Sequence, residues 1–231
     1  MAGDRIAGRD YREVTVQDRG LYVDGNYHST VSQKEQSDGE GDIAARKILI
    51  LAANPRNSSR LQLGNEVKAI DEGLRRSRDR EQFTLTSKWA VTTRDFYRYM
   101  LDIKPHIVHF CGHGRGEAGI VLEDGEGRTE LLGSDAITDL FKLFAQEGLE
   151  CALLNACYSE VQADAIVQHV PYVIGMNQEI GDRAATVFAV AFYDALGAGR
   201  EIEFAFELGC SQLVQLKEHE TPVLYRQQDC F

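Results

Sequence analysis

Hydrophobic residues gather into short continuous runs that alternate with segments of helical spacing from residue 47 onward. Runs with few polar side chains are typical of strands buried on both faces of a parallel sheet, and they occur at 47–53, 107–111, 151–156 and 172–176. Hydrophobic residues spaced three or four apart predict helices between them, near 63–74, 94–101, 134–148, 159–168, 182–197 and 201–216. This alternation predicts an α/β fold with a mainly parallel central sheet and helices on both faces.

Local signals complete the predicted order of elements. Residues 83–89 alternate as a strand does, and 222–225 form a short final segment. A hairpin is predicted where two apolar pieces flank Asp124-Gly125-Glu126-Gly127. Residues able to cap a helix stand at three of the predicted helix starts, and these are Thr93, Ser134 and Asp182.

The first 45 residues differ from the rest in composition. They are polar, with isolated hydrophobic residues such as Tyr22 and Val23, and cannot build a core alone. We therefore predict a polar arm or linker over 1–45 and one globular domain over 46–231. A chain of 231 residues with 43% hydrophobic content has enough apolar material for such a domain.

Charge and cysteine content restrict the class of protein. Lys and Arg number 25 against 36 Asp and Glu, so the net charge of −11 argues against nucleic-acid binding by bulk charge. Five cysteines, an odd number without a Cys-x-x-Cys pair, favour free thiols in a reducing cytoplasm. No apolar stretch is long enough to span a bilayer, so we expect no membrane insertion.

Two predicted strands end in residues that carry chemistry. One is followed by Gly112-His113-Gly114, and the other leads through Asn155 and Ala156 to Cys157. Because functional groups gather beyond the carboxyl ends of strands in such sheets, we expect the imidazole and the thiol at one edge. A histidine beside a thiol favours the nucleophilic thiolate. The backbone N–H groups of Gly114 and Cys157 are candidate donors to an oxyanion.

Other chemistries for these residues are weaker. His106, His109 and His113 could suggest zinc, but positions 106 and 109 point to opposite faces of a strand, so no metal site is expected. We interpret His109 as a sheet histidine with hydrogen-bond partners. The glycine-rich loop lacks the spacing of either phosphate-binding fingerprint, and no cofactor is expected.

Over residues 47–216 the sequence resembles the caspase-like cysteine peptidases, and most closely their bacterial CHAT branch. The matching motifs are 109–114, with the sequence His-Phe-Cys-Gly-His-Gly, and 153–159, with the sequence Leu-Leu-Asn-Ala-Cys-Tyr-Ser. The resemblance implies a three-layer α/β/α caspase-hemoglobinase fold, a catalytic dyad of His113 and Cys157, and peptide-bond hydrolysis through an acyl-enzyme. Bacterial relatives often act in defence or regulated cell death by cleaving a partner protein once triggered.

The substrate pocket departs from the wider family. Metacaspase-type members that cut after Arg or Lys carry an aspartate two residues before the nucleophile, where this chain has Asn155. A basic residue before the cleaved bond is therefore not implied, and neither Arg115 nor Arg183 can be assigned to a pocket for Asp. Asn155 and Asp182 are the candidate pocket residues. Asp182 and Glu160 could form a pocket for a cationic side chain, although carboxylates in the first turn of a helix more often stabilise the helix dipole.

The sequence thus predicts a regulated cysteine endopeptidase acting on a protein substrate. Residues 1–45 are a candidate docking segment for an activator or recruiting protein. The alternative is a catalytically silent caspase-like scaffold that serves as a protein interaction module, against which intact His113 and Cys157 argue.

Overall fold

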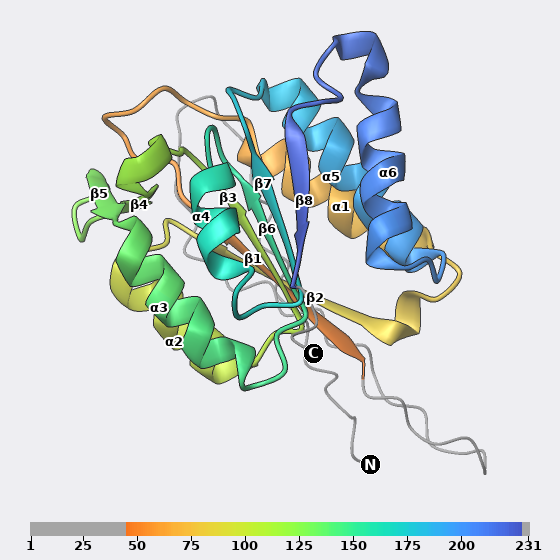
Figure 1. Cartoon of the computed structure of the whole chain (residues 1–231), viewed down its shortest axis with the longest axis horizontal. Helices are drawn as coiled ribbons and strands as arrows, with labels where there is room; N and C mark the ends of the chain where they lie inside the picture. Colours follow the sequence, from red (N-terminus) through yellow and green to blue (C-terminus); the bar gives the residue numbers. More distant parts are fainter. Residues whose placement is uncertain (1–44, 228–231) are drawn as a thin grey trace, which may run out of the picture.

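Six strands form the central sheet of the computed structural model, which describes residues 45–227 (Figure 1). In spatial order they are β2 (Phe83–Trp89), β1 (Arg46–Ala52), β3 (Ile107–Cys111), β6 (Cys151–Asn155), β7 (Tyr172–Met176) and β8 (Pro222–Arg226). Neighbours are parallel except β8, which is antiparallel to β7. A separate hairpin joins β4 (Ile120–Glu123) to β5 (Thr129–Leu132). The mainly parallel sheet and the hairpin are as predicted.

Helices cover both faces of this sheet (Figure 1). One face carries α1 (Leu63–Arg76), α5 (Asp182–Gly197) and α6 (Ile202–Gln212). The other carries α2 (Thr93–Ile103), α3 (Ser134–Ala145) and α4 (Glu160–Ile166). Short 3-10 turns lie at Arg80–Gln82, Gly116–Ala118 and Val214–Leu216. The predicted three-layer α/β/α architecture is confirmed.

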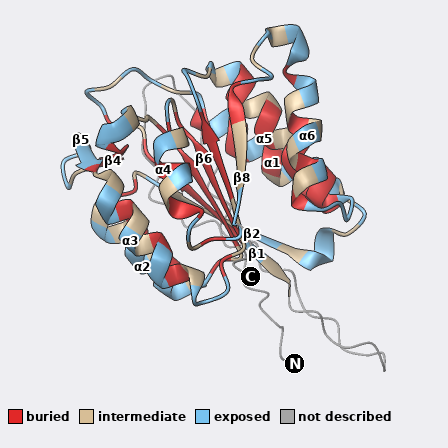
Figure 2. Ribbon diagram, in the orientation of Figure 1, coloured by how far each residue is buried: buried red, intermediate tan, exposed pale blue. Residues whose placement is uncertain are grey.

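Each face of the sheet has its own hydrophobic core. Along β1 the side chains alternate, so Ile48 and Ile50 enter the core under α1 and α5, whereas Leu49 and Leu51 enter the core under α2 and α3. All four are fully buried, and the inner strands are buried along their lengths in Figure 2. Burial on both faces explains why the sequence shows continuous hydrophobic runs rather than alternation.

The start of α2 differs by one residue from its prediction. Thr92, not Thr93, is the N-cap, and its hydroxyl oxygen accepts from the Asp95 N–H at 3.1 Å. The Asp95 carboxylate accepts in return from the Thr92 N–H, which completes a capping box. Thr93 instead donates its hydroxyl to Glu130 of the hairpin.

Two further predicted caps, Ser134 and Asp182, lie just inside their helices. The Ser134 hydroxyl donates to the Glu117 carbonyl at 2.7 Å, and the Asp182 carboxylate accepts from the Gln62 N–H at 3.1 Å. Glycines precede them as the N-caps of α3 and α5. The prediction of these caps was wrong because both side chains bond to segments distant in the sequence, which local reasoning cannot see.

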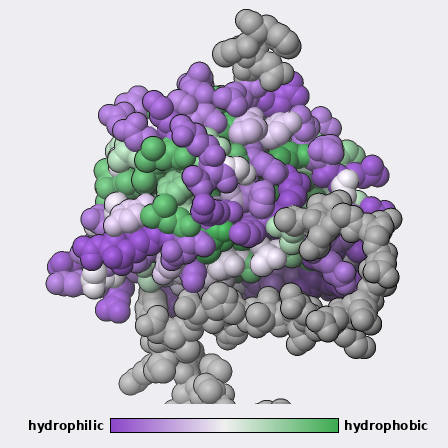
Figure 3. All heavy atoms as spheres, turned by 90° about the horizontal axis from the view of Figure 1, so that it is seen from below, coloured by the Kyte–Doolittle hydropathy of each residue, from purple (hydrophilic) through white to green (hydrophobic). Residues whose placement is uncertain are grey.

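The strand order reverses beside β1, which pairs with β2 on one side and with β3 on the other. The carboxyl ends of β3 and β6 therefore meet near a topological switch point, where open α/β sheets place their sites. In the view from below of Figure 3, hydrophilic residues surround smaller hydrophobic areas. Within 45–227 no helix is both long and apolar enough to cross a membrane. The predicted arm at 1–45 lies almost entirely outside the described residues.

Candidate active site

The pairing of β3 with β6 brings the two predicted motifs together. Cys111 is in register with Asn155 at the ends of these strands, and the Gly112 N–H donates to the Asn155 carbonyl at 3.4 Å. His113 and Cys157 each follow two residues beyond a strand end, and both line one cavity of about 30 Å³. The structure thus places the candidate base and the candidate nucleophile on the same small cavity.

A backbone carbonyl fixes the ring of His113. The Nε2 atom lies 2.7 Å from the carbonyl oxygen of Ser59, in the loop between β1 and α1. A carbonyl oxygen can only accept, so Nε2 carries the proton in this contact. In the neutral ring the other nitrogen, Nδ1, then has a free lone pair and can take a proton. This arrangement suits a general base.

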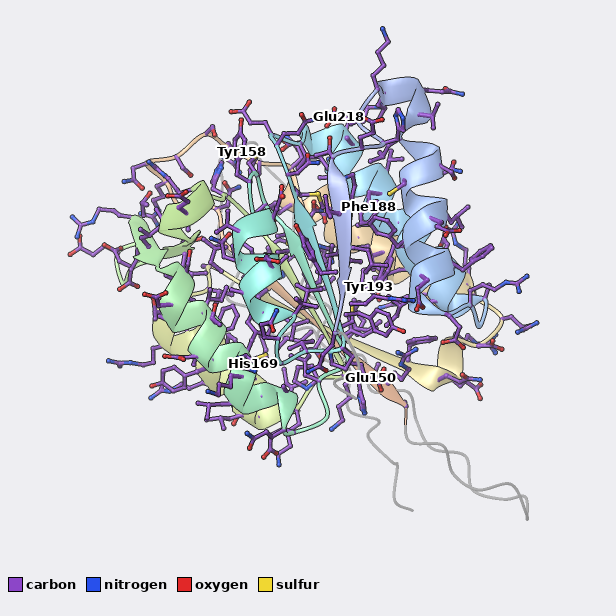
Figure 4. All side chains as sticks on the ribbon, viewed as in Figure 1. Glu150, Tyr158, His169, Phe188, Tyr193 and Glu218 are labelled. Carbon is purple, nitrogen blue, oxygen red and sulfur yellow. The ribbon has the colours of Figure 1, made fainter. Side chains whose placement is uncertain are left out.

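Cys157 lies at a sharp turn between β6 and α4. Its side chain is partly exposed, and its Sγ lies 3.9 Å from the Ile180 carbonyl oxygen. The next residue, Tyr158, has a φ of 56°, a left-handed conformation that non-glycine residues rarely adopt. Figure 4 shows Tyr158 at the end of the sheet opposite Glu150, which precedes β6. The thiol is thus presented at the carboxyl edge.

The other described thiols are poorly suited to nucleophilic attack. Burial raises the pKa of the Cys111 thiol well above its usual value, and the nearby charge of Glu66 raises it further. Burial also raises the pKa of Cys151 to about 12 and that of Cys210 to about 11. Because only the thiolate attacks, these three cysteines stay protonated and unreactive near neutral pH.

Gly114 packs directly on the backbone that carries the candidate nucleophile. A β-carbon at this position would lie 2.0 Å from the Cys157 carbonyl oxygen, a distance that no side chain could occupy. Neither the Gly114 N–H nor the Cys157 N–H donates a hydrogen bond to another residue of 45–227. Both groups are therefore free to donate to a ligand, as an oxyanion site requires.

The candidate pocket residues Asn155 and Asp182 both line the cavity, together with a residue that the sequence analysis missed. Glu66 of α1 reaches the cavity from the face that packs on the sheet, and it is only 3% exposed. Its spacing from Leu63 and Ile70 could have identified it, because an acid on the apolar face of a predicted helix is unusual. Glu160, Arg115 and Arg183 do not line this cavity.

The three histidines of the discounted zinc pattern lie in different surroundings. His106 accepts through Nδ1 from the Lys47 N–H at 2.9 Å, at the start of β3. His109 is fully buried, and its Nε2 lies 3.1 Å from Glu66 Oε1. Neither ring nitrogen makes a hydrogen bond within the described residues, so the expected hydrogen-bond partners of His109 are not found. Within the described residues no three His, Cys, Asp or Glu side chains are grouped as metal ligands.

Comparison with known protein families gives one match over most of the chain. The model of the CHAT domain matches residues 26–222, so the match begins within the segment predicted as an arm. A Roc-COR-CHAT protease from an unknown prokaryotic organism is 25% identical over 80% of this chain. A probable protease of Gillisia limnaea is 24% identical over 71% of the chain. The chain spans only 19% and 30% of these two relatives.

Solved structures share the fold at low sequence identity. A secreted C11 cysteine protease from Bacteroides thetaiotaomicron, crystallised with an irreversible peptide inhibitor, superposes with a TM-score of 0.59 at 14% identity. The match covers 80% of this chain and 66% of the chain of that protease. The Drosophila initiator caspase Dronc gives a TM-score of 0.55 at 12% identity, covering 87% of this chain and 93% of its own. Both structures support the caspase-like fold predicted from the sequence.

Proposed function

The chain belongs to the CHAT domain family of caspase-like proteins, and from this premise we propose that it is a cysteine endopeptidase. The observation that carries the proposal is the shared cavity of His113 and Cys157 at the ends of two paired strands. Relatives named as proteases support the same class of reaction.

The proposed reaction proceeds through an acyl-enzyme. His113 Nδ1 takes the proton of the Cys157 thiol, and the thiolate forms a carbon–sulfur bond to the substrate carbonyl. The N–H groups of Gly114 and Cys157 donate to the oxyanion. When the carbon–nitrogen bond breaks, His113 returns the proton to the leaving amine, and water then hydrolyses the thioester with His113 again acting as base. Asn155 and Asp182 contact the substrate side chain next to the cleaved bond.

Regulation belongs to the same proposal. The chain acts as a cytoplasmic effector in a bacterial defence or cell-death system, and residues 1–45 bind an activator or recruiting protein. Deleting these residues should leave cleavage of short peptides intact and abolish activation by the partner. Equal activation of the truncated chain would contradict this part of the proposal. The deletion also removes residues 26–45, which the family match includes, so a thermal melt must first show that the truncated chain folds.

The decisive test compares the full chain with its Cys157→Ala variant on a proteome-derived peptide library, with new termini read by mass spectrometry. We expect the termini to disappear in Cys157→Ala and to persist in Cys210→Ala, a control at a thiol outside the cavity. Termini that persist in Cys157→Ala would contradict the assignment of the nucleophile. A biological output unchanged by Cys157→Ala would support the scaffold alternative.

A further inference from the structure

We propose that the cavity beside Cys157 is a slot for a Lys or Arg side chain of the protein substrate, and that Glu66 is the residue that selects it. The inference rests on the proposed peptidase function, because it names the substrate class of that same site. Three of the oxygen-bearing side chains that line the cavity support it, those of Glu66, Asn155 and Asp182.

Glu66 is a buried carboxylate at the cavity. Its Oε1 accepts from Asn155 Nδ2 at 2.7 Å, and His109 approaches the same oxygen from β3. His109 itself does not line the cavity and stacks on Tyr193, with 5.8 Å between the ring centroids. A carboxylate that is 3% exposed requires donors, and of these two neighbours only Asn155 makes a hydrogen bond to it.

Asn155 adds a hydrogen-bond acceptor that has no donor as its partner. Its amide nitrogen donates to Glu66 and to the Ala185 carbonyl, which fixes the amide orientation. The residue is only 4% exposed, and its buried Oδ1 receives no hydrogen bond from the described residues. Buried acceptors are rarely left unpaired, and this one belongs to a residue that lines the cavity, so it suits a ligand that brings N–H groups.

The charge of the cavity is negative. Glu66 and Asp182 line it, and no Lys or Arg of the described residues does so. A carboxylate side chain would be repelled by both acids, whereas ammonium and guanidinium groups carry donors alone and form charge-assisted hydrogen bonds.

The remaining walls suit the rest of a basic side chain. They include the aliphatic side chains of Leu61, Leu63, Ile180 and Ala185. Lys and Arg have a flexible hydrocarbon stem below the charged group, and such stems pack on apolar surface. The cavity is small, about 30 Å³, so it favours a slender chain over a bulky aromatic one.

Glu66 also resolves the departure at Asn155. Asn155 lies two residues before the proposed nucleophile, and its amide is hydrogen-bonded to an acid from α1. The negative charge next to Asn155 thus comes from α1 rather than from the segment that carries Cys157. Sequence motifs around Cys157 alone could not reveal it, because Glu66 lies 89 residues away from Asn155.

The test uses two peptide chloromethyl ketones that differ only in arginine or citrulline at the residue next to the reactive group. Citrulline has the same length but replaces the guanidinium by a neutral urea. The Cys157 thiolate displaces chloride to form a carbon–sulfur bond, and the rate is followed by mass spectrometry of the full chain. The variants are Glu66→Gln and Asp182→Asn. Glu72→Gln, an exposed position on the same helix, is the matched control.

We expect the arginine reagent to label Cys157 about 10- to 100-fold faster than the citrulline reagent, the range of one or two charge-assisted hydrogen bonds. This ratio should fall about tenfold in Glu66→Gln and in Asp182→Asn, and stay unchanged in Glu72→Gln. Asp182→Asn keeps the Oδ atom that accepts from Gln62, so it tests the slot even if Glu66→Gln fails to fold.

A ratio near one in the unmodified chain would overturn the inference. So would a ratio unaffected by both variants, or no labelling by either reagent while iodoacetamide still alkylates Cys157. Cleavage that depends on Cys157 but follows neutral residues would refute the slot and leave the proposed function standing. Selective labelling by arginine without any Cys157-dependent cleavage would refute the function and leave the slot standing.

Discussion

The Nε2 atom of His113 lies 2.7 Å from the carbonyl oxygen of Ser59, so the imidazole is held by the loop that follows β1. Three elements therefore meet at the cavity: the Ser59 loop orients the ring, the loop after β3 carries it, and the turn after β6 carries Cys157. Because the contact uses only backbone on the Ser59 side, it depends on loop conformation rather than on the identity of residue 59.

Replacing His113 tests the base. We expect His113→Ala to lower kcat for peptide cleavage by about 10²- to 10⁴-fold, the usual contribution of a general acid–base group, with little change in melting temperature. His219→Ala, at an exposed histidine outside the cavity, should cleave at the normal rate. Normal turnover in His113→Ala would remove this residue from the mechanism.

Thiol labelling compares the reactivity of Cys157 with that of the cysteines whose thiol pKa is raised by burial. A raised pKa means a smaller thiolate fraction at a given pH, so at pH 8 burial leaves about one Cys210 thiol in a thousand and one Cys151 thiol in ten thousand ionised. We expect iodoacetamide to alkylate Cys157 at least about tenfold faster than Cys111, Cys151 and Cys210, as measured by peptide mapping. Raising the pH towards 11 should recruit Cys210, provided that the chain stays folded. Equal rates at pH 8 would contradict the assignment of Cys157 as the accessible thiol.

The strands and the two motifs were predictable because both depend on local pattern. A strand buried on both faces must be apolar throughout, as 48–51 is, and parallel strands must end at one edge. The joint placement of His113 and Cys157 on one cavity follows from these two rules. Comparison with caspase-like structures agrees with that fold.

What sequence reasoning could not supply are contacts between distant segments. Ser59 offers only a backbone carbonyl, which leaves no signature in the residue type. Asp182 fits the pattern of a cap but bonds to Gln62, 120 residues away. Glu66 stands on the apolar face of α1, but only the packing of that helix on the sheet brings it against Asn155 and His109.

Gly114 offers a steric test of the site. Gly114→Ala would place a β-carbon 2.0 Å from the Cys157 carbonyl oxygen, so the loop that carries the nucleophile must move. We expect at least a hundredfold loss of cleavage, because misplacement by about 1 Å can cost that much. Gly125→Ala in the β4–β5 turn has open space around its added carbon and should keep full activity. If both variants cleave equally well, the close approach at Gly114 has no role in the site.

The turn after β6 is held in place by Ser159, whose side chain is fully buried. Its hydroxyl donates to the Leu154 carbonyl at 2.6 Å and accepts from the Met176 N–H at 3.0 Å, so it joins the turn to β7. Ser159→Ala removes both hydrogen bonds and leaves the buried Met176 N–H without an acceptor. We expect the free energy of unfolding to fall by about 1–3 kcal/mol, measured by urea denaturation.

Cleavage by Ser159→Ala should fall as well, because the residue lies two positions from Cys157 and restrains the turn that presents the thiol. Ser211→Ala, at an exposed serine of α6, should change stability by no more than about 0.5 kcal/mol and leave cleavage unchanged. A stable but inactive Ser159→Ala would mean that the hydroxyl orients the nucleophile more than it holds the fold. A variant with unchanged stability and activity would show that the turn keeps its shape without this link to β7.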